Sequence, residues 1–402
     1  MGKSILIISY YIGTDNSVAG RRWAKFTSQL IKNGHKVFLF CNKNNISVDF
    51  KDKVHVITGI NSFYPKILKT QPNNLLKKII YGLSLFYLKF LTKGSYYDLG
   101  CLQKKEFQNK ISKIINKYEI SNVIVSGAPF SYLYYVALLR KKIDFNFIAD
   151  FRDAWTWSKT NGISFLKNKR IIEEKKREIL VLKVADNLIV ASLDLKIHID
   201  LQLKTNKISK KSIVLTNSIE FCEKEISFDN FNNSKLVISH IGTIPLKTKK
   251  YWKMFLNYLN ETDLELKVDF YSNSNKDFFE DAIKVKTNNI NFLPRISETE
   301  LLIKLQKSSF LLIFKQDSFS NTFSSKFFDY VKSQRPILAF SNSGIFSNEL
   351  LENNIGHIIN EHTSFKTIDN IILKKRNFYN RSYNWKKFST ENVTYELETL
   401  LL

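Results

Sequence analysis

The sequence predicts an α/β protein made of two doubly wound parallel sheets, and three observations lead to this fold class. Apolar, β-prone runs alternate with segments of helical periodicity along most of the chain. The chain has 402 residues, more than one hydrophobic core usually holds. The alternation stops in a polar stretch without periodicity and then begins again. We therefore predict a first domain at 1–220, a linker at 221–234 and a second domain at 235–402.

The first domain begins with a βαβ unit. The run "SILIISYY" is continuously apolar, as expected for a strand buried on both faces, and "RRWAKFTSQLIKNG" has helical spacing that ends at Gly34, a favoured residue after a helix C-terminus. The strand "HKVFLFC" follows, and two strands joined through a helix imply a parallel sheet. The alternation continues with strands at 120–129, 145–151, 186–192 and 212–219 and helices at 130–142 and 167–185.

The second domain repeats the pattern. Its predicted strands are 235–244, 264–273, 289–296, 309–315 and 335–341, with helices at 251–260, from Ser297 and from Ser325. The last stretch, 365–402, is mostly helical, and we expect a C-terminal helix to pack back on the first domain. Two open α/β domains in tandem, each Rossmann-like, predict a central cleft, with ligands at the carboxyl ends of the strands.

Composition limits the class of function. The formal net charge is +24, from 61 Lys and Arg against 37 Asp and Glu. Such an excess indicates a polyanionic partner, or a general drift of composition toward Lys and Asn.

Cysteines and apolar runs bear on the location of the protein. The three cysteines lie far apart, the N-terminus shows no signal peptide, and the sequence has no apolar run long enough to span a membrane. We expect a cytoplasmic protein, or one that is peripheral on the inner face of the cytoplasmic membrane.

The first candidate site lies in "SSKFFDYVKSQRPILAF". Ser325 and Lys326 open a predicted helix, whose N-terminus attracts anions, and Lys326 adds a mobile positive donor. Asp329 lies three residues on, so it shares a face with Lys326. A cation and a carboxylate one turn apart suit the phosphates and ribose of a nucleoside diphosphate. An ordinary i,i+3 ion pair is the alternative that spacing alone leaves open.

This segment resembles the donor-site motif of GT-B glycosyltransferases of the family 4 type, which reads Lys, two apolar residues, Glu, Tyr and then Gly-Lys-Pro-Ile-Leu. The resemblance implies that Lys326 contacts the donor pyrophosphate and that Asp329 contacts the ribose. This chain departs from the pattern at two carboxylate positions. The ribose carboxylate is an aspartate, one methylene shorter, and Asn321 stands where the family often has an earlier glutamate.

Further donor residues follow from the same resemblance. The segment "SHIGTIPLKTKK" is similar to the first strand of the family's C-terminal domain, so Gly242 and Thr243 form the expected turn and Lys249 or Lys247 reaches the diphosphate. In the N-terminal loop "GTDNSVAGRRW", Gly20 would let the backbone approach the diphosphate and Arg22 would face the acceptor. A plain turn into a helix explains that loop equally.

The most specific resemblance is "IADFRDAWTW", residues 148–157. It is similar to a branch of the family that carries Asp-Phe-Arg-Asp-Pro-Trp, with alanine here in place of proline. We predict that Arg152 and Asp153 are catalytic, with Asp153 binding the acceptor or relaying a proton. Asp150 and Trp155 are predicted to bind the acceptor. We expect all four residues to line the cleft, and we do not expect Arg152 and Asp153 to form an ion pair at the surface. For Trp157 we favour packing within the loop.

One segment differs from its surroundings. Within 63–94, apolar residues fall on one helical stripe and six lysines surround it. This composition is typical of an interfacial helix on an anionic membrane, and also of a helix that packs in the core beneath solvated lysines.

Together the residues and the resemblance predict a glycosyltransferase of the hexosyltransferase type. It would move a sugar from a nucleoside-diphosphate sugar to a glycan acceptor, such as a lipid-linked saccharide in bacterial surface polysaccharide synthesis, by a retaining mechanism. We expect no cofactor and no metal, because no Asp-x-Asp stands where it could bridge a metal to phosphate. A sugar-nucleotide epimerase on a similar scaffold is the alternative. Nucleic acid is not expected as a partner, because no recognised nucleic-acid-binding motif is present.

Overall fold

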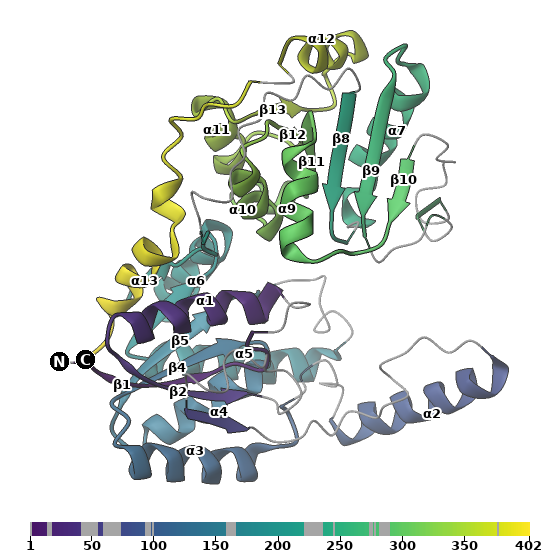
Figure 1. The fold of residues 1–402 in the computed structure, drawn as a ribbon. Helices are drawn as coiled ribbons and strands as arrows, with labels where there is room; N and C mark the ends of the chain where they lie inside the picture. The colour runs from purple at the N-terminus through teal and green to yellow at the C-terminus, as the bar shows by residue number, and fades with distance from the viewer. Residues whose placement is uncertain are drawn as a thin grey trace. The chain divides into compact units, whose positions relative to one another are not determined.

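The chain folds into two compact units, shown in Figure 1. The computed structural model describes residues 2–13, 18–41, 55–58, 74–92, 98, 100–157, 166–220, 236–243, 246–272, 276, 279–280, 290–375 and 378–402. The N-terminal unit comprises Met1–Thr216 and Thr390–Leu402, and the C-terminal unit comprises Asn217–Ser389. The predicted linker at 221–234 lies outside the described residues.

The N-terminal unit holds a seven-stranded parallel sheet with the strand order β3-β2-β1-β4-β5-β6-β7. Its strands are β1 (Ser4–Ile8), β2 (Lys36–Cys41), β3 (His55–Thr58), β4 (Asn122–Gly127), β5 (Asn146–Phe151), β6 (Asn187–Val190) and β7 (Ser212–Val214). The middle strands β4 and β5 are buried along their whole length, as their continuous apolar runs predict.

Helices cover both faces of this sheet. They are α1 (Val18–Lys32), α3 (Lys104–Tyr118), α4 (Phe130–Arg140), α5 (Asn168–Val184), α6 (Leu193–Thr205) and α13 (Thr390–Glu398). A further helix, α2 (Leu75–Leu91), extends away from the sheet (Figure 1). Because side chains alternate along a strand, Leu6 and Ile8 pack in one core with α3 to α6, whereas Ile5 and Ile7 pack in another with α1 and α13. Helix α1 ends as predicted, with Gly34 at a positive φ of 85°.

The C-terminal unit holds a six-stranded parallel sheet with the order β10-β9-β8-β11-β12-β13. Its strands are β8 (Leu236–Ile241), β9 (Leu266–Tyr271), β10 (Ile290–Leu293), β11 (Phe310–Phe314), β12 (Ile337–Phe340) and β13 (Gly356–Ile359). Its α-helices are α7 (Lys249–Glu261), α9 (Glu298–Gln306), α10 (Ser325–Ser333), α11 (Ile345–Glu352) and α12 (Phe365–Lys375), with short 3₁₀ turns at η5 (Leu246–Thr248), η6 (Asp317–Phe319) and η7 (Trp385–Phe388). Helices α7 and α12 cover one face, and α9 to α11 cover the other.

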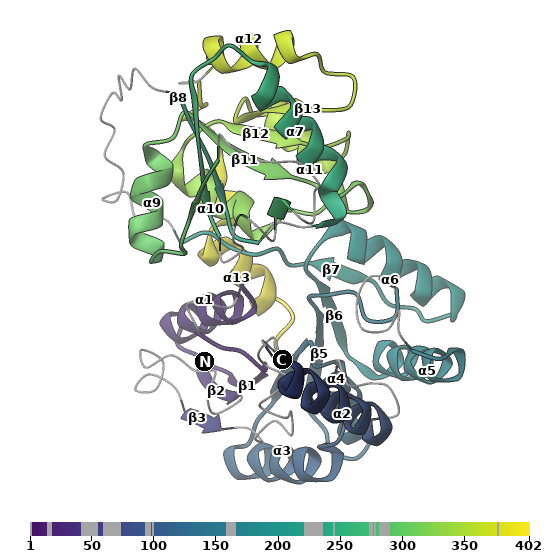
Figure 2. The same cartoon turned by 90° about the vertical axis from the view of Figure 1, so that its right-hand side faces the viewer.

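Both sheets confirm the predicted α/β class with two doubly wound, Rossmann-like units (Figures 1 and 2). In each sheet the strand order reverses beside the first strand, between β1 and β4 and between β8 and β11. Such a reversal leaves a crevice at the carboxyl ends of the two strands, where ligands of this fold class bind. No helix among the described residues is long and apolar enough to cross a membrane.

Candidate functional site

The reversal point of the C-terminal sheet brings three predicted donor residues together. Gly242 directly follows β8, and its φ of 74° is a conformation that L side chains rarely adopt. The Lys326 ammonium donates a hydrogen bond to the carbonyl of Thr243, at 3.1 Å. A Cβ atom on Gly242 would lie 3.4 Å from Lys326 Cε, an ordinary contact distance, so the positive φ and not a lack of space is what favours glycine here. Gly242 and Thr243 are exposed, and the turn is open to a ligand.

Helix α10 is hydrogen-bonded, through Tyr330, to both strands that flank the reversal point. The Tyr330 hydroxyl accepts a hydrogen bond from the Ile241 amide of β8 at 3.2 Å and donates one to the Leu312 carbonyl of β11 at 3.0 Å. His240 Nδ1 lies 2.8 Å from the same carbonyl, inside a cage of Trp252, Phe270 and Phe314. Burial holds the pKa of His240 well below its ordinary value, so this histidine is neutral and structural.

Lys326 is a partly exposed positive group. Desolvation lowers the pKa of its ammonium to about 8. In the described part of the chain no carboxylate forms an ion pair with it, and the i,i+3 pair with Asp329 is not made. An anion bound here would therefore stabilise the charged, protonated form of Lys326. The N-terminus of α10, which begins one residue earlier, favours the same sign of ligand.

The other donor candidates have less defined contacts. Ser325 is the first residue of α10 and is partly exposed; its neighbour Ser324 is the N-cap, without a side-chain capping bond. Asp329 is half-buried on the same helix. Lys249 begins α7, where the ion pairs belong instead to Lys250, which contacts Asp317 and Glu361 at 2.6 Å each. Gly20 lies in the first turn of α1 and is buried, and its carbonyl accepts from the Gly13 amide.

In the N-terminal unit, Asp150 is a buried structural group, which corrects the prediction that it binds the acceptor. Its Oδ2 accepts hydrogen bonds from Trp23 Nε1 at 3.0 Å and Ser126 Oγ at 2.7 Å, and its Oδ1 lies 3.6 Å from Arg22 Nη2. The side chains of Arg22 and Asp150 are both 0% exposed. Arg22 also donates to the carbonyls of Leu215 and Thr216, at 2.7 Å each. Arg22 therefore joins α1 to β5 and to the chain after β7, and its predicted contact with the acceptor is corrected too.

Arg152 and Asp153, in contrast, are accessible to solvent. The Arg152 Nε and Nη2 atoms donate to Asp153 Oδ2 at 3.0 and 2.7 Å. The side chains are 18% and 49% exposed. The two residues thus form the surface ion pair that we expected them not to form. Both remain open to a ligand at the carboxyl end of β5.

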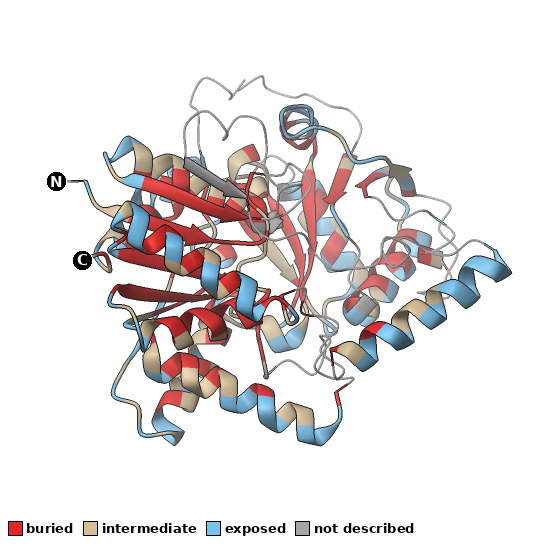
Figure 3. Cartoon of the chain, turned by 90° about the horizontal axis from the view of Figure 1, so that it is seen from below, coloured by how far each residue is buried: buried red, intermediate tan, exposed pale blue. Residues whose placement is uncertain are grey.

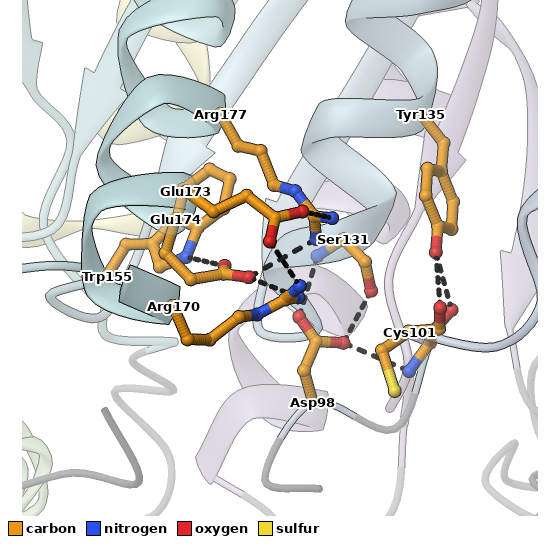
Figure 4. Close-up of polar contacts among 10 residues, drawn as sticks. Asp98, Cys101, Ser131, Tyr135, Trp155, Arg170, Glu173, Glu174 and Arg177 are labelled. Atoms are coloured by element: carbon orange, nitrogen blue, oxygen red, sulfur yellow. Dashed lines mark hydrogen bonds and ion pairs between the residues drawn. The ribbon is translucent and has the colours of Figure 1, made fainter. Parts of the chain in front are cut away.

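Trp155 is also buried, which corrects its predicted role as a surface for an acceptor sugar. It is 2% exposed and stacks on Phe130, with ring centroids 5.3 Å apart and planes 7° apart. Its Nε1 donates to Glu174 Oε2 at 3.0 Å. Figure 4 shows that Arg170 and Arg177 donate to the same glutamate, at 2.6 and 3.2 Å. The indole therefore anchors the loop after β5 to α5 instead of contacting solvent.

Comparison with known proteins identifies the architecture. The sequence matches no protein-family model and no curated protein. A glycosyltransferase from Rickettsia africae has a similar structure, with a TM-score of 0.61 at 13% identity over 100% of this chain and 94% of that one. A sucrose-phosphate synthase from Thermosynechococcus elongatus gives 0.60 at 11% over 99% and 95%. A UDP-GlcNAc 2-epimerase from Methanocaldococcus jannaschii gives 0.53 at 14% over 99% and 100%. The chain has the GT-B fold. Identities this low establish the fold and leave the reaction open.

Sequence reasoning missed three buried carboxylates in the N-terminal half of this GT-B chain. Asp98 accepts from the Ser131 amide, the Ser131 hydroxyl and the Gly100 amide at 2.7, 2.5 and 3.0 Å, and burial raises its pKa (Figure 4). Glu174 binds Trp155, and Glu178 accepts from the Thr156 hydroxyl. Burial raises the pKa of Glu178 to about 7. The i,i+4 spacing of the two glutamates was the available signal, because it places both on one face of α5.

Sequence reasoning also missed Lys315, the residue directly after β11 at the reversal point of the C-terminal sheet. It is 5% exposed, and its ammonium donates to the Thr322 carbonyl. Lys315 thus holds the loop that leads into α10. Among the described residues, no group of three or more His, Cys, Asp or Glu is placed to hold a metal ion.

Proposed function

We propose that the chain is a glycosyltransferase that uses a nucleoside-diphosphate sugar. The observation that carries this proposal is the position of Lys326, whose ammonium lies against the Gly242–Thr243 turn at the reversal point of the C-terminal sheet. The lysine and the α10 N-terminus offer positive charge, and the glycine turn lets a ligand approach the backbone. A diphosphate is the ligand that uses all three.

In this proposal the donor lies along α10. Lys326 neutralises the charge that develops on the leaving diphosphate, so that no metal is needed, and Ser325 adds a donor at the helix N-terminus. Asp329, one turn later, accepts from the ribose hydroxyls. Lys249 completes the donor contacts proposed from the family resemblance, whereas Gly20, which that resemblance also implies, is buried in the N-terminal unit.

On the acceptor side, the proposal rests on Arg152 and Asp153. Both are accessible, and their side chains are joined at 2.7 Å. Arg152 holds an acceptor hydroxyl or phosphate, and Asp153 accepts the proton that the attacking hydroxyl loses. We further propose retention at the transferred hexose, a lipid-linked saccharide of a bacterial surface polysaccharide as acceptor, and a cytoplasmic location at the membrane, where such an acceptor is carried.

An epimerase acting on a sugar nucleotide is the second candidate, and the structural likeness to a UDP-GlcNAc 2-epimerase is the observation that favours it. The two candidates differ in what they require. An epimerase converts UDP-N-acetylhexosamine without any acceptor, whereas a transferase releases the nucleoside diphosphate in proportion to the acceptor glycosylated. Incubation of the protein with the donor alone, followed by chromatography of the nucleotide sugars, distinguishes them.

Calorimetric binding of UDP, GDP and ADP tests the donor site. We expect one of them to bind, and Lys326→Ala to weaken it by about tenfold to a hundredfold, the usual effect of losing a charge-assisted hydrogen bond. Lys253→Ala is the control, because Lys253 is an exposed lysine on α7 of the same unit. Equal affinity in the Lys326→Ala protein would refute the donor site.

The pH dependence of nucleotide affinity is a second test of the same site. The free Lys326 ammonium loses its proton near pH 8. A bound diphosphate stabilises the charged form, so affinity is greatest below that pH and declines as pH rises through it. The Lys326→Ala protein should lack this decline, and a parallel decline in both proteins would assign it to another group.

A further inference from the structure

Helix α2 carries a broad apolar face that no described part of the chain covers. Leu75, Phe86 and Phe90 are 75%, 72% and 75% exposed, and Leu83 is 66% exposed. The helix is nevertheless well formed at its start, because the Asn74 side chain accepts a hydrogen bond from the Lys77 amide at 2.8 Å. In Figure 3, where it extends to the right as in Figure 1, its residues are mostly pale blue or tan.

The exposed residues form one continuous surface. Successive residues of an α-helix turn by about 100°, so Leu75, Ile79, Leu83, Phe86 and Phe90 align along the helix axis. Leu76, Ile80 and Tyr87 lie beside them and are also exposed. The opposite side contains Leu88, which is buried, and Leu85 and Tyr81, which are half-buried. The narrower side of α2 thus contacts the protein, and its wider apolar side is exposed to solvent.

The lysines of α2 flank this apolar surface. Lys77 lies beyond one edge of it, and Lys78 and Lys89 lie beyond the other, and all three are exposed. Residues 74–92 contain no acidic side chain. Long lysine side chains at the edges of an apolar face extend to anionic headgroups while the apolar residues enter the acyl boundary.

This arrangement decides between the two interpretations of the sequence. A helix that packs in the core would bury its leucines, whereas Leu75, Leu76 and Leu83 are 75%, 68% and 66% exposed. A second copy of the chain, docked face to face, would bring two sets of lysines together around one apolar seam and would be opposed by their repulsion. An anionic lipid surface satisfies both the apolar face and the charge at its edges.

We propose that α2 docks the protein on anionic bilayers, lying in the interface with Leu75, Leu83, Phe86 and Phe90 inserted and Lys77, Lys78 and Lys89 at the headgroups. This inference goes beyond the proposed reaction and does not depend on it. It can be tested with vesicles alone, without a sugar nucleotide. A membrane-docked catalyst would have ready access to acceptors that carry a lipid.

Flotation of the full chain with vesicles tests this docking. Vesicles of phosphatidylcholine, with and without phosphatidylglycerol, are mixed with the protein at physiological ionic strength. We expect the protein to float with the anionic vesicles. Leu83→Gln, Phe86→Gln and Phe90→Gln together should lower the partition coefficient by about a hundredfold or more, because three apolar side chains no longer leave water.

Lysine variants separate the contribution of charge to vesicle binding from the contribution of apolar insertion. Lys77→Gln, Lys78→Gln and Lys89→Gln should each reduce binding to anionic vesicles by about fivefold and leave binding to neutral vesicles unchanged. Ile197→Gln with Leu201→Gln is the matched control, because these α6 residues are 56% and 57% exposed and lie outside the proposed face. This control should float like the parent.

Three results would overturn the proposal. The first is a full chain that stays unbound on anionic vesicles. The second is an apolar-face variant that floats as well as the parent. The third is a parent that sediments as a dimer and becomes monomeric in the apolar-face variant without ever binding vesicles, which would assign the face to a second copy of the chain.

Discussion

Two aspartates three residues apart in the motif after β5 have opposite environments. Asp150 is fully buried and holds Trp23, Ser126 and Arg22, whereas Asp153 is 49% exposed and forms an ion pair with Arg152. The difference comes from where the strand ends. Strand β5 runs to Phe151, and Asp150 lies in register between Ser126 of β4 and Ile189 of β6, inside the sheet. One motif therefore combines a structural residue with a candidate catalytic one.

Replacing each aspartate should separate these roles. Asp150→Ala leaves Arg22 buried without its counter-charge, so we expect the free energy of unfolding to fall by about 3–5 kcal/mol. Asp153→Ala removes an exposed ion pair and should change it by less than about 1 kcal/mol. Urea unfolding of both variants measures the difference. A similar loss in both would mean that burial does not distinguish the two residues.

The sequence could predict the motif but not this division of roles. A family resemblance transfers residues by position, and it gave Asp150, Arg152, Asp153 and Trp155 one shared location facing a ligand. The burial of Asp150 and Trp155 depends on partners distant in sequence, namely Trp23, Phe130 and Glu174. Lys326 could be identified locally, because the start of a helix is visible in the sequence. Its hydrogen bond to the distant Thr243 carbonyl was not visible there.

At the scale of elements, α5 fixes the loop that carries Arg152 and Asp153. Glu174 accepts from Trp155 Nε1, and Glu178 accepts from the Thr156 hydroxyl, so two buried glutamates hold two successive loop residues. Trp157 then stacks on His198 of α6, at a centroid distance of 5.2 Å, which agrees with loop packing. Residues 155–157 are thus held by contacts with α5 and α6. The charged helix was predictable from sequence, but the contacts of its inward face were not.

Glu178 should make stability depend on pH in an unusual direction. Burial raises its pKa from 4.5 to about 7 in the folded chain. Between these values the folded state holds a proton that the unfolded state has lost, so the Glu178 contribution to stability is present at low pH and declines as pH rises to about 7. Glu178→Gln removes this titration and should be more stable than the parent above that pH, by roughly 3 kcal/mol.

Urea unfolding of the parent and Glu178→Gln across this pH range provides the measurement. The other titrating groups are common to both proteins, so only the difference between the two curves is informative. That difference should grow as pH rises and then level off. Curves that stay parallel would show that Glu178 is ionised throughout or is not buried in solution.

At the scale of the whole molecule, the N-terminal unit is built from two distant segments of chain. After the C-terminal unit, the last helix, α13, returns to α1 and completes one of the two cores of the N-terminal sheet. The contacts extend to the chain end, since the Lys3 ammonium donates to the Leu401 carbonyl at 2.7 Å. The strand and helix alternation was readable from apolar runs in both halves. The final helix was expected to pack on the first domain, and in the structure it packs against α1. Which surface of that domain it covers could not be predicted, because a short amphipathic helix does not specify its partner.

The return of α13 gives a prediction about stability at long range. Leu397 is 0% exposed and packs with α1 residues in this core, whereas Tyr395 on the same helix is 68% exposed. Leu397→Ala should lower the free energy of unfolding of the N-terminal unit by about 2–5 kcal/mol, because it leaves a cavity in a packed core, and Tyr395→Ala should have little effect. Thermal unfolding followed by calorimetry can show whether only one of two transitions moves. If Leu397→Ala leaves both transitions in place, the last helix does not belong to the folded N-terminal core.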